Sequence, residues 1–143
     1  MINESDIAYF AGLFDGEGSI DYKQRWERKK KKTGYKRYKT WRISMEVSMT
    51  DESVIRWIHE IFKVGTVRKI DKTKGAGGKP HYKPQWRWRS TFREAYQVCR
   101  LIWPYTQVKL HKVEQLIDHY SDDYVFDEKV VSLQRYKEAM SLE

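Results

Sequence analysis

The hydrophobic periodicity of this 143-residue chain changes from helical to strand spacing twice along its length. Residues 5–14 have helical spacing, with Ser5 or Asp6 as the expected cap, and two alternating segments follow around a basic turn at 28–34. The pattern then recurs as a helix, two strands and a helix, at residues 50–63, 66–70, 82–90 and 91–102. The order αββαββα predicts an α+β fold with a twisted four-stranded antiparallel sheet, covered by helices on one face and open on the other.

A single domain over residues 1–143 is expected from this length, with a core at about 5–120. Residues 121–143 are expected to form a C-terminal helical extension, which follows a helix at about 108–120. The single cysteine, Cys99, lies in an apolar helical run and is expected to be a buried, inert thiol. Because no segment has membrane length or the pattern of a signal peptide, we expect a soluble, intracellular protein.

Positive charge is concentrated in one half of the chain. The formal net charge is +8, and residues 23–42 contain eleven Lys or Arg and one acid. Residues 118–143 instead contain seven acids and three basic residues. Neutralisation of phosphate is the sequence-independent part of nucleic-acid affinity, so the basic half predicts a nucleic-acid partner. A membrane surface also attracts lysine clusters, but here the charges alternate with apolar residues as in a strand.

Two acids follow the first predicted helix within the run Asp15-Gly16-Glu17-Gly18. The helix macrodipole disfavours carboxylates at a helix C-terminus, and a divalent cation bound by carboxylate and carbonyl oxygens would relieve that conflict. Ala11 and Gly12 lie in the middle of the same helix, where glycine costs roughly 1 kcal/mol relative to alanine. Small residues there are consistent with the close approach of a second backbone.

Residues 10–18, Phe-Ala-Gly-Leu-Phe-Asp-Gly-Glu-Gly, resemble the nine-residue signature of the LAGLIDADG homing endonucleases. They depart from it at Phe10, Phe14, Gly16 and Glu17, and Glu17 stands at the metal-binding position with its charge retained. The αββαββα order is also the core of that family. The resemblance therefore extends over about residues 5–120 and weakens after Ser121.

The resemblance implies a metal site made by two copies of the chain. Glu17 would be a metal ligand and catalytic residue, and the Gly16 carbonyl a second oxygen donor. Mg²⁺ is the expected ion, with Mn²⁺ and Ca²⁺ as alternative occupants. Because the motif occurs once, a homodimer would bring two Glu17 residues together, with Ala11 and Gly12 facing the partner. Asp15 would be structural and accept hydrogen bonds across the helix pair.

The resemblance also points to a lysine after the second hairpin. Lys109, five residues past Pro104, would project toward the active site and either stabilise negative charge on the scissile phosphate or position the attacking water. The sequence departs from the family at Met49, where a Gln or Lys often helps to hold the active-site water. Ser48 or Thr50 would have to substitute for it.

The open face of the sheet is expected to bind double-stranded DNA, since a twisted, basic four-stranded ribbon fits the major groove, where strands can present side chains to base edges. Strand alternation favours Trp86 and Trp88 pointing inward with the intervening arginines outward, and Trp41, Trp57 and Trp103 are expected in the core. The candidate DNA-binding residues are Lys23, Arg25, Glu27, Arg28, Lys30, Arg37, Thr40, Arg42, Ser44, Glu46, Arg68, Lys72, Lys74, Arg87 and Arg89.

The function implied by the resemblance is site-specific, metal-dependent hydrolysis of DNA by a homodimer that recognises a long pseudo-palindromic site. One phosphodiester on each strand would be cut by an activated water, in the service of intron or intein homing, with no small-molecule cofactor and no membrane partner. Three alternatives stay open. They are a DNA-binding regulator that does not cleave, an RNA-binding intron maturase of the same fold, and a basic structural protein.

Overall fold

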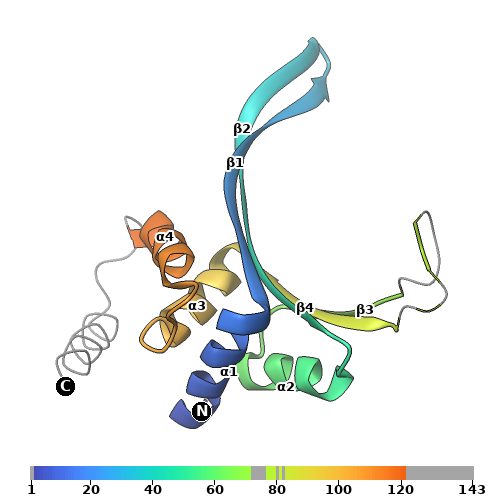
Figure 1. Ribbon diagram of the computed structural model, residues 1–143. Helices are drawn as coiled ribbons and strands as arrows, with labels where there is room; N and C mark the ends of the chain where they lie inside the picture. The colour runs from blue at the N-terminus through green and yellow to red at the C-terminus, as the bar shows by residue number, and fades with distance from the viewer. Residues whose placement is uncertain (1, 72–76, 80, 82, 122–143) are drawn as a thin grey trace.

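The computed structural model of this chain describes residues 2–71, 77–79, 81 and 83–121. Eight elements follow one another in these residues (Figure 1): α1 (Glu4–Glu17), β1 (Gly18–Lys31), β2 (Gly34–Met49), α2 (Glu52–Phe62), β3 (Thr66–Ile70), β4 (Gln85–Thr91), α3 (Phe92–Ile102) and α4 (Leu110–Ser121). The order αββαββα is confirmed, and α4 follows it. The helix predicted after Asp127, and the candidate residues Lys72 and Lys74, lie outside the described residues.

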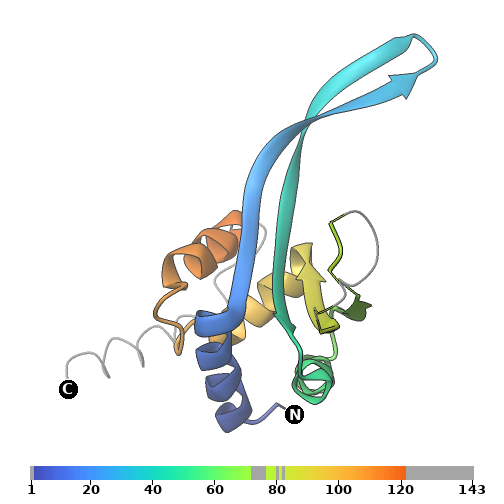
Figure 2. The ribbon, with the colours of Figure 1, turned by 45° about the vertical axis from the view of Figure 1, so that its right-hand side comes forward.

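The four strands form one antiparallel sheet in the order β1-β2-β4-β3. The helices lie on one side of it, and the long β1–β2 hairpin curves away from them on the other (Figures 1 and 2). The predicted fold class is therefore confirmed. We call the side without helices the open face and the other the helix side.

The core lies between the helix side of the sheet and the four described helices, α1, α2, α3 and α4. Phe10 of α1 packs edge-on against Phe62 and Trp88, with ring centroids 4.8 Å and 5.6 Å away. Trp88 is completely buried and donates its indole N–H to the Val64 carbonyl at 3.0 Å. Burial of Trp88 on the helix side confirms that the tryptophans of β4 point inward and the arginines outward. Cys99 is also fully buried, and this burial raises the pKa of its thiol, as expected for an inert cysteine.

The first hairpin is longer than the sequence pattern predicted. β1 continues to Lys31, which pairs with Gly34, so Arg28 belongs to a strand and only Lys32 and Thr33 form the turn. A run of five basic residues carries no apolar alternation, and the strand there is defined by its backbone pairing with β2. β4 begins at Gln85 and not at residue 82.

The side chains of Asn3 and Asp51 cap the N-termini of α1 and α2. Asn3, and neither Ser5 nor Asp6, caps α1, because its side chain accepts the Asp6 N–H at 3.0 Å. Asp51 caps α2 as predicted and accepts the N–H groups of Ser53 and Val54. α1 also runs to Glu17, so the two acids of the motif lie inside its last turn and not beyond it.

Trp41 does not join the core, although Trp103 does. Trp41 lies on the helix side, opposite Gln24, but is 38% exposed. Its ring stacks on Tyr22 at 5.1 Å and meets His119 of α4 edge-on at 4.7 Å. The Tyr22 hydroxyl and the Nδ1 atom of His119 are 3.2 Å apart, so this cluster ties α4 to the root of the hairpin.

Gly65, which precedes β3, is a position where we expect substitution to be costly. Its φ is +84°, and a Cβ atom there would lie 2.6 Å from the Arg89 carbonyl oxygen. We expect Gly65→Ala to lower the free energy of unfolding by about 3 kcal/mol, from backbone strain and overpacking together. Gly77→Ala is the control, since Gly77 has φ +80° with nothing within 4 Å of its Cβ. Urea unfolding followed by tryptophan fluorescence would contradict this if both variants lost the same amount.

Candidate catalytic site and nucleic-acid interface

Asp15, in the last turn of α1, holds the segment that leads into α4. Its Oδ2 atom accepts the Gln107 N–H at 2.7 Å, and its Oδ1 atom accepts the Lys109 N–H at 3.1 Å. Both oxygens therefore bind backbone of the same chain, which differs from the expected hydrogen bonds across a helix pair. Asp15 fixes the position of residues 107–109 against the end of α1.

Lys109 lies at the C-terminal end of α1. Its Nζ atom donates to the Asp15 carbonyl oxygen at 2.9 Å. Carbonyls in the last turn of a helix lack an intrahelical donor and carry partial negative charge, so the ammonium group satisfies one of them. Lys109 thus provides part of the positive charge that we expected a metal ion to supply at the C-terminus of α1. The structure brings this side chain to within two residues of Glu17 along α1.

Glu17 is the acid at this junction whose carboxylate is not engaged by another group of the described structure. It is exposed and forms no hydrogen bond or ion pair with the described part of the chain, in contrast to Asp15. Gly16 is also exposed, and its carbonyl belongs to the last turn of α1. These are hard oxygen donors of the kind that Mg²⁺ and Ca²⁺ prefer. Nowhere in the described residues do three His, Cys, Asp or Glu side chains come together, so each chain offers this position one carboxylate.

Ala11 and Gly12, the two small residues expected to face a partner chain, differ in exposure. Ala11 is completely buried in the chain's own core, so the expectation that it faces a partner is wrong. The reason is that Ala11 belongs to the same apolar stripe as Phe10 and Phe14. Gly12 is exposed, and a Cβ atom added there would meet nothing within 4 Å. Tyr9 and Gly16 are exposed on the same side of α1.

The open face gathers most of the predicted DNA-binding residues. Register brings them together across strands, because Lys23 pairs with Arg42, and Arg89 with Glu46. The full set on this face is Lys23, Arg25, Glu27, Thr40, Arg42, Glu46, Arg68, Arg87 and Arg89. Ser44 shares the face but is only 4% exposed, so neighbouring side chains cover most of it.

The carboxylates of the open face are paired with its cations. Asp21 contacts Arg42 at 2.8 Å and Lys23 at 3.7 Å. Glu46 lies between Arg87 and Arg89, at 3.5 Å and 3.7 Å from their Nε atoms. These last distances exceed those of a hydrogen bond, and both Nε atoms lack a hydrogen-bond partner within the described structure. Pairs this exposed contribute little to stability, but they hold the guanidinium groups in place over the sheet.

The residues after Val47 alternate across the end of β2. Met49 lies on the helix side opposite Trp86 and packs against the core. Ser48 lies on the open face opposite Arg87. Of the residues considered as substitutes for a polar group at Met49, Ser48 thus has its side chain on the basic face.

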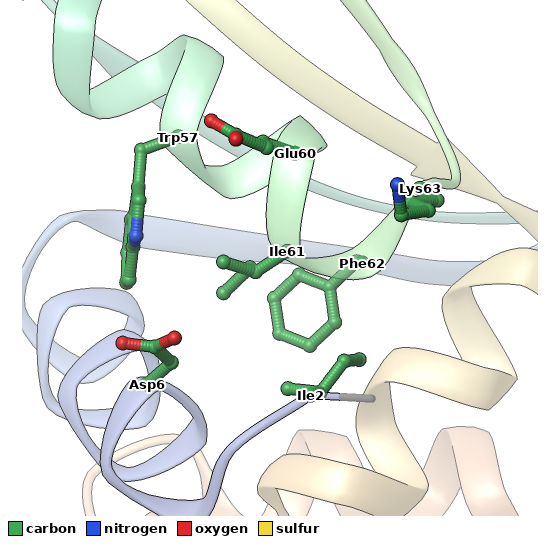
Figure 3. A pocket seen from close by; sticks show the side chains of 7 residues that line it. All are labelled: Ile2, Asp6, Trp57, Glu60, Ile61, Phe62 and Lys63. Carbon is green, nitrogen blue, oxygen red and sulfur yellow. The ribbon is translucent and has the colours of Figure 1, made fainter.

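A pocket of about 590 Å³ lies between the start of α1 and α2 (Figure 3). Its lining includes the carboxylates of Asp6 and Glu60 as well as Trp57 and Ile61. Asp6 is eleven residues from Glu17 along α1, or roughly 16 Å at the helical rise per residue. The pocket is therefore separate from the end of α1, and with two acids and one lysine, Lys63, its lining has a net negative charge that disfavours a polyanion.

The sequence profile of the LAGLIDADG endonuclease family matches residues 10–100. A search of curated proteins found no match. No described helix is long and apolar enough to cross a membrane.

Solved structures similar to this chain include homing endonucleases. The homing endonuclease I-CvuI, in complex with its target in the presence of Ca, has a TM-score of 0.58 and 18% identity, over 80% of this chain and 65% of that one. A second I-CvuI complex, with the I-CreI target and Mg and with its DNA not cleaved, has the same TM-score and identity over 94% and 76%. The homing endonuclease I-TnaI has a TM-score of 0.54 and 18% identity over 93% and 84%. The chain thus spans less than two thirds of the first of these, and the likeness shows the shared fold.

Proposed function

Since this chain belongs to the LAGLIDADG endonuclease family, we propose that it is a site-specific, metal-dependent endonuclease that cleaves both strands of duplex DNA as a homodimer. The observation that carries the proposal is the junction at the end of α1. There Asp15 accepts the Lys109 N–H, and the Lys109 ammonium group binds the Asp15 carbonyl, two residues before the exposed Glu17 at the start of a basic sheet. The relatives' role in homing extends the proposal to an intron- or intein-encoded enzyme.

Duplex binding is assigned to the open face. The cations on β1, β2, β3 and β4 would neutralise phosphates, while side chains such as Arg42 and Arg87 would meet base edges in the major groove. The curvature of the strands away from the helices gives this face a concave shape that suits a duplex (Figures 1 and 2). Support also comes from the I-CvuI structures, which are complexes with DNA targets.

The divalent cation, for which Mg²⁺ is the proposed ion, would be held by the Glu17 carboxylate and the Gly16 carbonyl of each chain. When bound, it would lower the pKa of a water molecule and neutralise charge on the phosphate. The I-CvuI complexes are described in the presence of Ca and of Mg, which supports the use of a divalent ion.

Lys109 and Asp15 have separate roles in this proposal. The Lys109 ammonium group would stabilise the extra negative charge that develops on the phosphate, and Asp15 would keep its backbone in place. A water molecule attacks the phosphorus and one P–O ester bond breaks. No covalent bond to the enzyme forms.

Selection of bound sites from a randomised duplex library, followed by cleavage of a plasmid carrying the selected site, tests the function. We expect the plasmid to become linear in Mg²⁺ and to stay intact in EDTA. Tight, site-specific binding without cleavage would instead identify a regulator. Stronger retention of structured RNA than of the selected duplex would identify an RNA-binding protein.

Dimer formation through α1 gives a separate prediction at Gly12. Its exposed position leaves room for a larger side chain in one copy, and Leu is a better helix former by roughly 1 kcal/mol. We therefore expect Gly12→Leu to keep or raise the stability of the fold but to prevent close packing of two α1 helices. Sedimentation equilibrium should give a mass near 17.3 kDa for the variant and about twice that for the wild type.

The matched control is Gln97→Leu, which adds the same side chain at an exposed position of α3. This variant is expected to sediment like the wild type. A dimeric Gly12→Leu variant would contradict the proposed interface.

A further inference from the structure

The hairpin formed by β1 and β2 has a second exposed face beyond the helices. Register pairs Trp26 with Lys39, Arg28 with Arg37, and Lys30 with Tyr35, all on the helix side of the sheet. Three predicted DNA-binding residues, Arg28, Lys30 and Arg37, therefore point away from the open face. We call this set of six residues the reverse face. Both views show the hairpin extending well past α4, so none of the helices in the described residues covers the reverse face (Figures 1 and 2).

The two faces of the hairpin differ in chemistry. The open face mixes cations with the carboxylates of Asp21, Glu27 and Glu46, each of which contacts a basic side chain. The reverse face instead contains four basic residues, Arg28, Lys30, Arg37 and Lys39, and no acid. Carboxylates beside cations are suited to distinguishing base edges, whereas cations alone attract phosphate regardless of sequence. The reverse face is therefore suited to a polyanion without sequence preference.

Two aromatic rings of the reverse face are exposed beside these cations. Trp26 is 55% exposed, with the Arg37 guanidinium 5.1 Å and the Lys39 ammonium 5.2 Å from its ring centroid. Tyr35 is 61% exposed, with Arg28 at 4.1 Å. An exposed indole can stack on a base only where that base is unpaired, because the bases of a duplex already stack on one another.

We propose that the reverse face binds single-stranded nucleic acid, with an unpaired base stacked on Trp26 and the flanking phosphates against Arg28, Arg37 and Lys39. Arg37 and Lys39 lie over the Trp26 ring, so a base that stacks there would displace a cation from the ring face and bring its own phosphate next to that cation. This activity goes beyond the proposed cleavage of duplex DNA and does not depend on it. The two faces lie on opposite sides of one ribbon, so a duplex and a single strand can bind at the same time.

Fluorescence anisotropy with labelled 12-nucleotide thymidylate and uridylate oligomers tests the proposal. We expect the wild type to bind them, and Trp26→Ala to weaken binding about tenfold, as for the loss of one stacked base. Trp26→Phe, which keeps an aromatic face, should restore most of the affinity. Tyr38→Ala is the matched control, since Tyr38 lies on the opposite face of the same hairpin beside Lys29.

The duplex selected for cleavage provides the second measurement. Trp26→Ala is expected to bind and cleave it as the wild type does, because Trp26 points away from the open face. Absence of oligomer binding by the wild type, or equal binding by Trp26→Ala, would overturn the proposal. An equal loss of duplex and oligomer affinity would also overturn it, by assigning Trp26 to the duplex interface. Preference between the two oligomers identifies RNA or DNA as the ligand.

Discussion

Glu17→Gln is expected to abolish cleavage of the selected duplex, by roughly 1,000-fold or more, while duplex affinity stays within a few-fold of wild type. The substitution keeps the size of the side chain and removes one ligand charge from each chain of the dimer. Because the Glu17 side chain is exposed and contacts no partner in the described structure, its loss should not disturb the fold. The effect thus separates catalysis from binding. Plasmid linearisation and a gel-shift assay, run on the same protein, measure the two quantities.

Metal binding provides a readout besides activity. Bound Tb³⁺ gives luminescence sensitised by tryptophan, and Ca²⁺ displaces this ion. In the presence of uncleaved duplex, we expect Glu17→Gln to give weaker luminescence than the wild type. Glu60→Gln makes the same charge change on α2, at the pocket away from the end of α1, and should leave both cleavage and luminescence unchanged. Cleavage by Glu17→Gln at the wild-type rate would remove Glu17 from the catalytic site.

Strand and helix periodicity predicted the parts of this fold in which apolar residues alternate with polar ones. The inward position of Trp88 and the outward positions of Arg87 and Arg89 followed from a period of two, because one face of β4 packs on the core. The same reasoning failed for Arg28–Lys31, where every side chain is basic and the strand is held by pairing with β2. Periodicity reports burial, and that segment is not buried.

Hydrophobic periodicity does not predict contacts between segments that are distant in the sequence. Asp15 and Gln107 are separated by 92 positions, and nothing in their spacing indicates that a carboxylate oxygen of one accepts the N–H of the other. The resemblance to a family suggested where Lys109 would lie, but not that its ammonium group donates to the Asp15 carbonyl. The sequence pattern also failed to predict the burial of Ala11 in the chain's own core. A small residue fits a core as well as an interface, and the sequence does not state which face of α1 the sheet covers.

Asp15→Asn is expected to misplace Lys109 and so to lower cleavage by roughly 100-fold. Two backbone N–H groups, those of Gln107 and Lys109, donate to separate carboxylate oxygens of Asp15. An asparagine offers one oxygen, and its NH₂ group would face the other N–H, which leaves a donor without an acceptor. We expect this to lower the free energy of unfolding by about 2 kcal/mol.

Lys109→Met separates the positioning of the segment from the charge of the lysine. It removes the ammonium group but keeps the Lys109 N–H on Asp15, so it should lower cleavage with little change in amide exchange. Asp15→Asn should instead speed hydrogen exchange at the Gln107 and Lys109 amides, because an N–H that has lost its acceptor exchanges more readily. Unchanged exchange in Asp15→Asn would show that the junction is held by other contacts. Loss of cleavage with unchanged exchange would mean that Asp15 acts on the phosphate or the metal ion directly and does not serve to position Lys109.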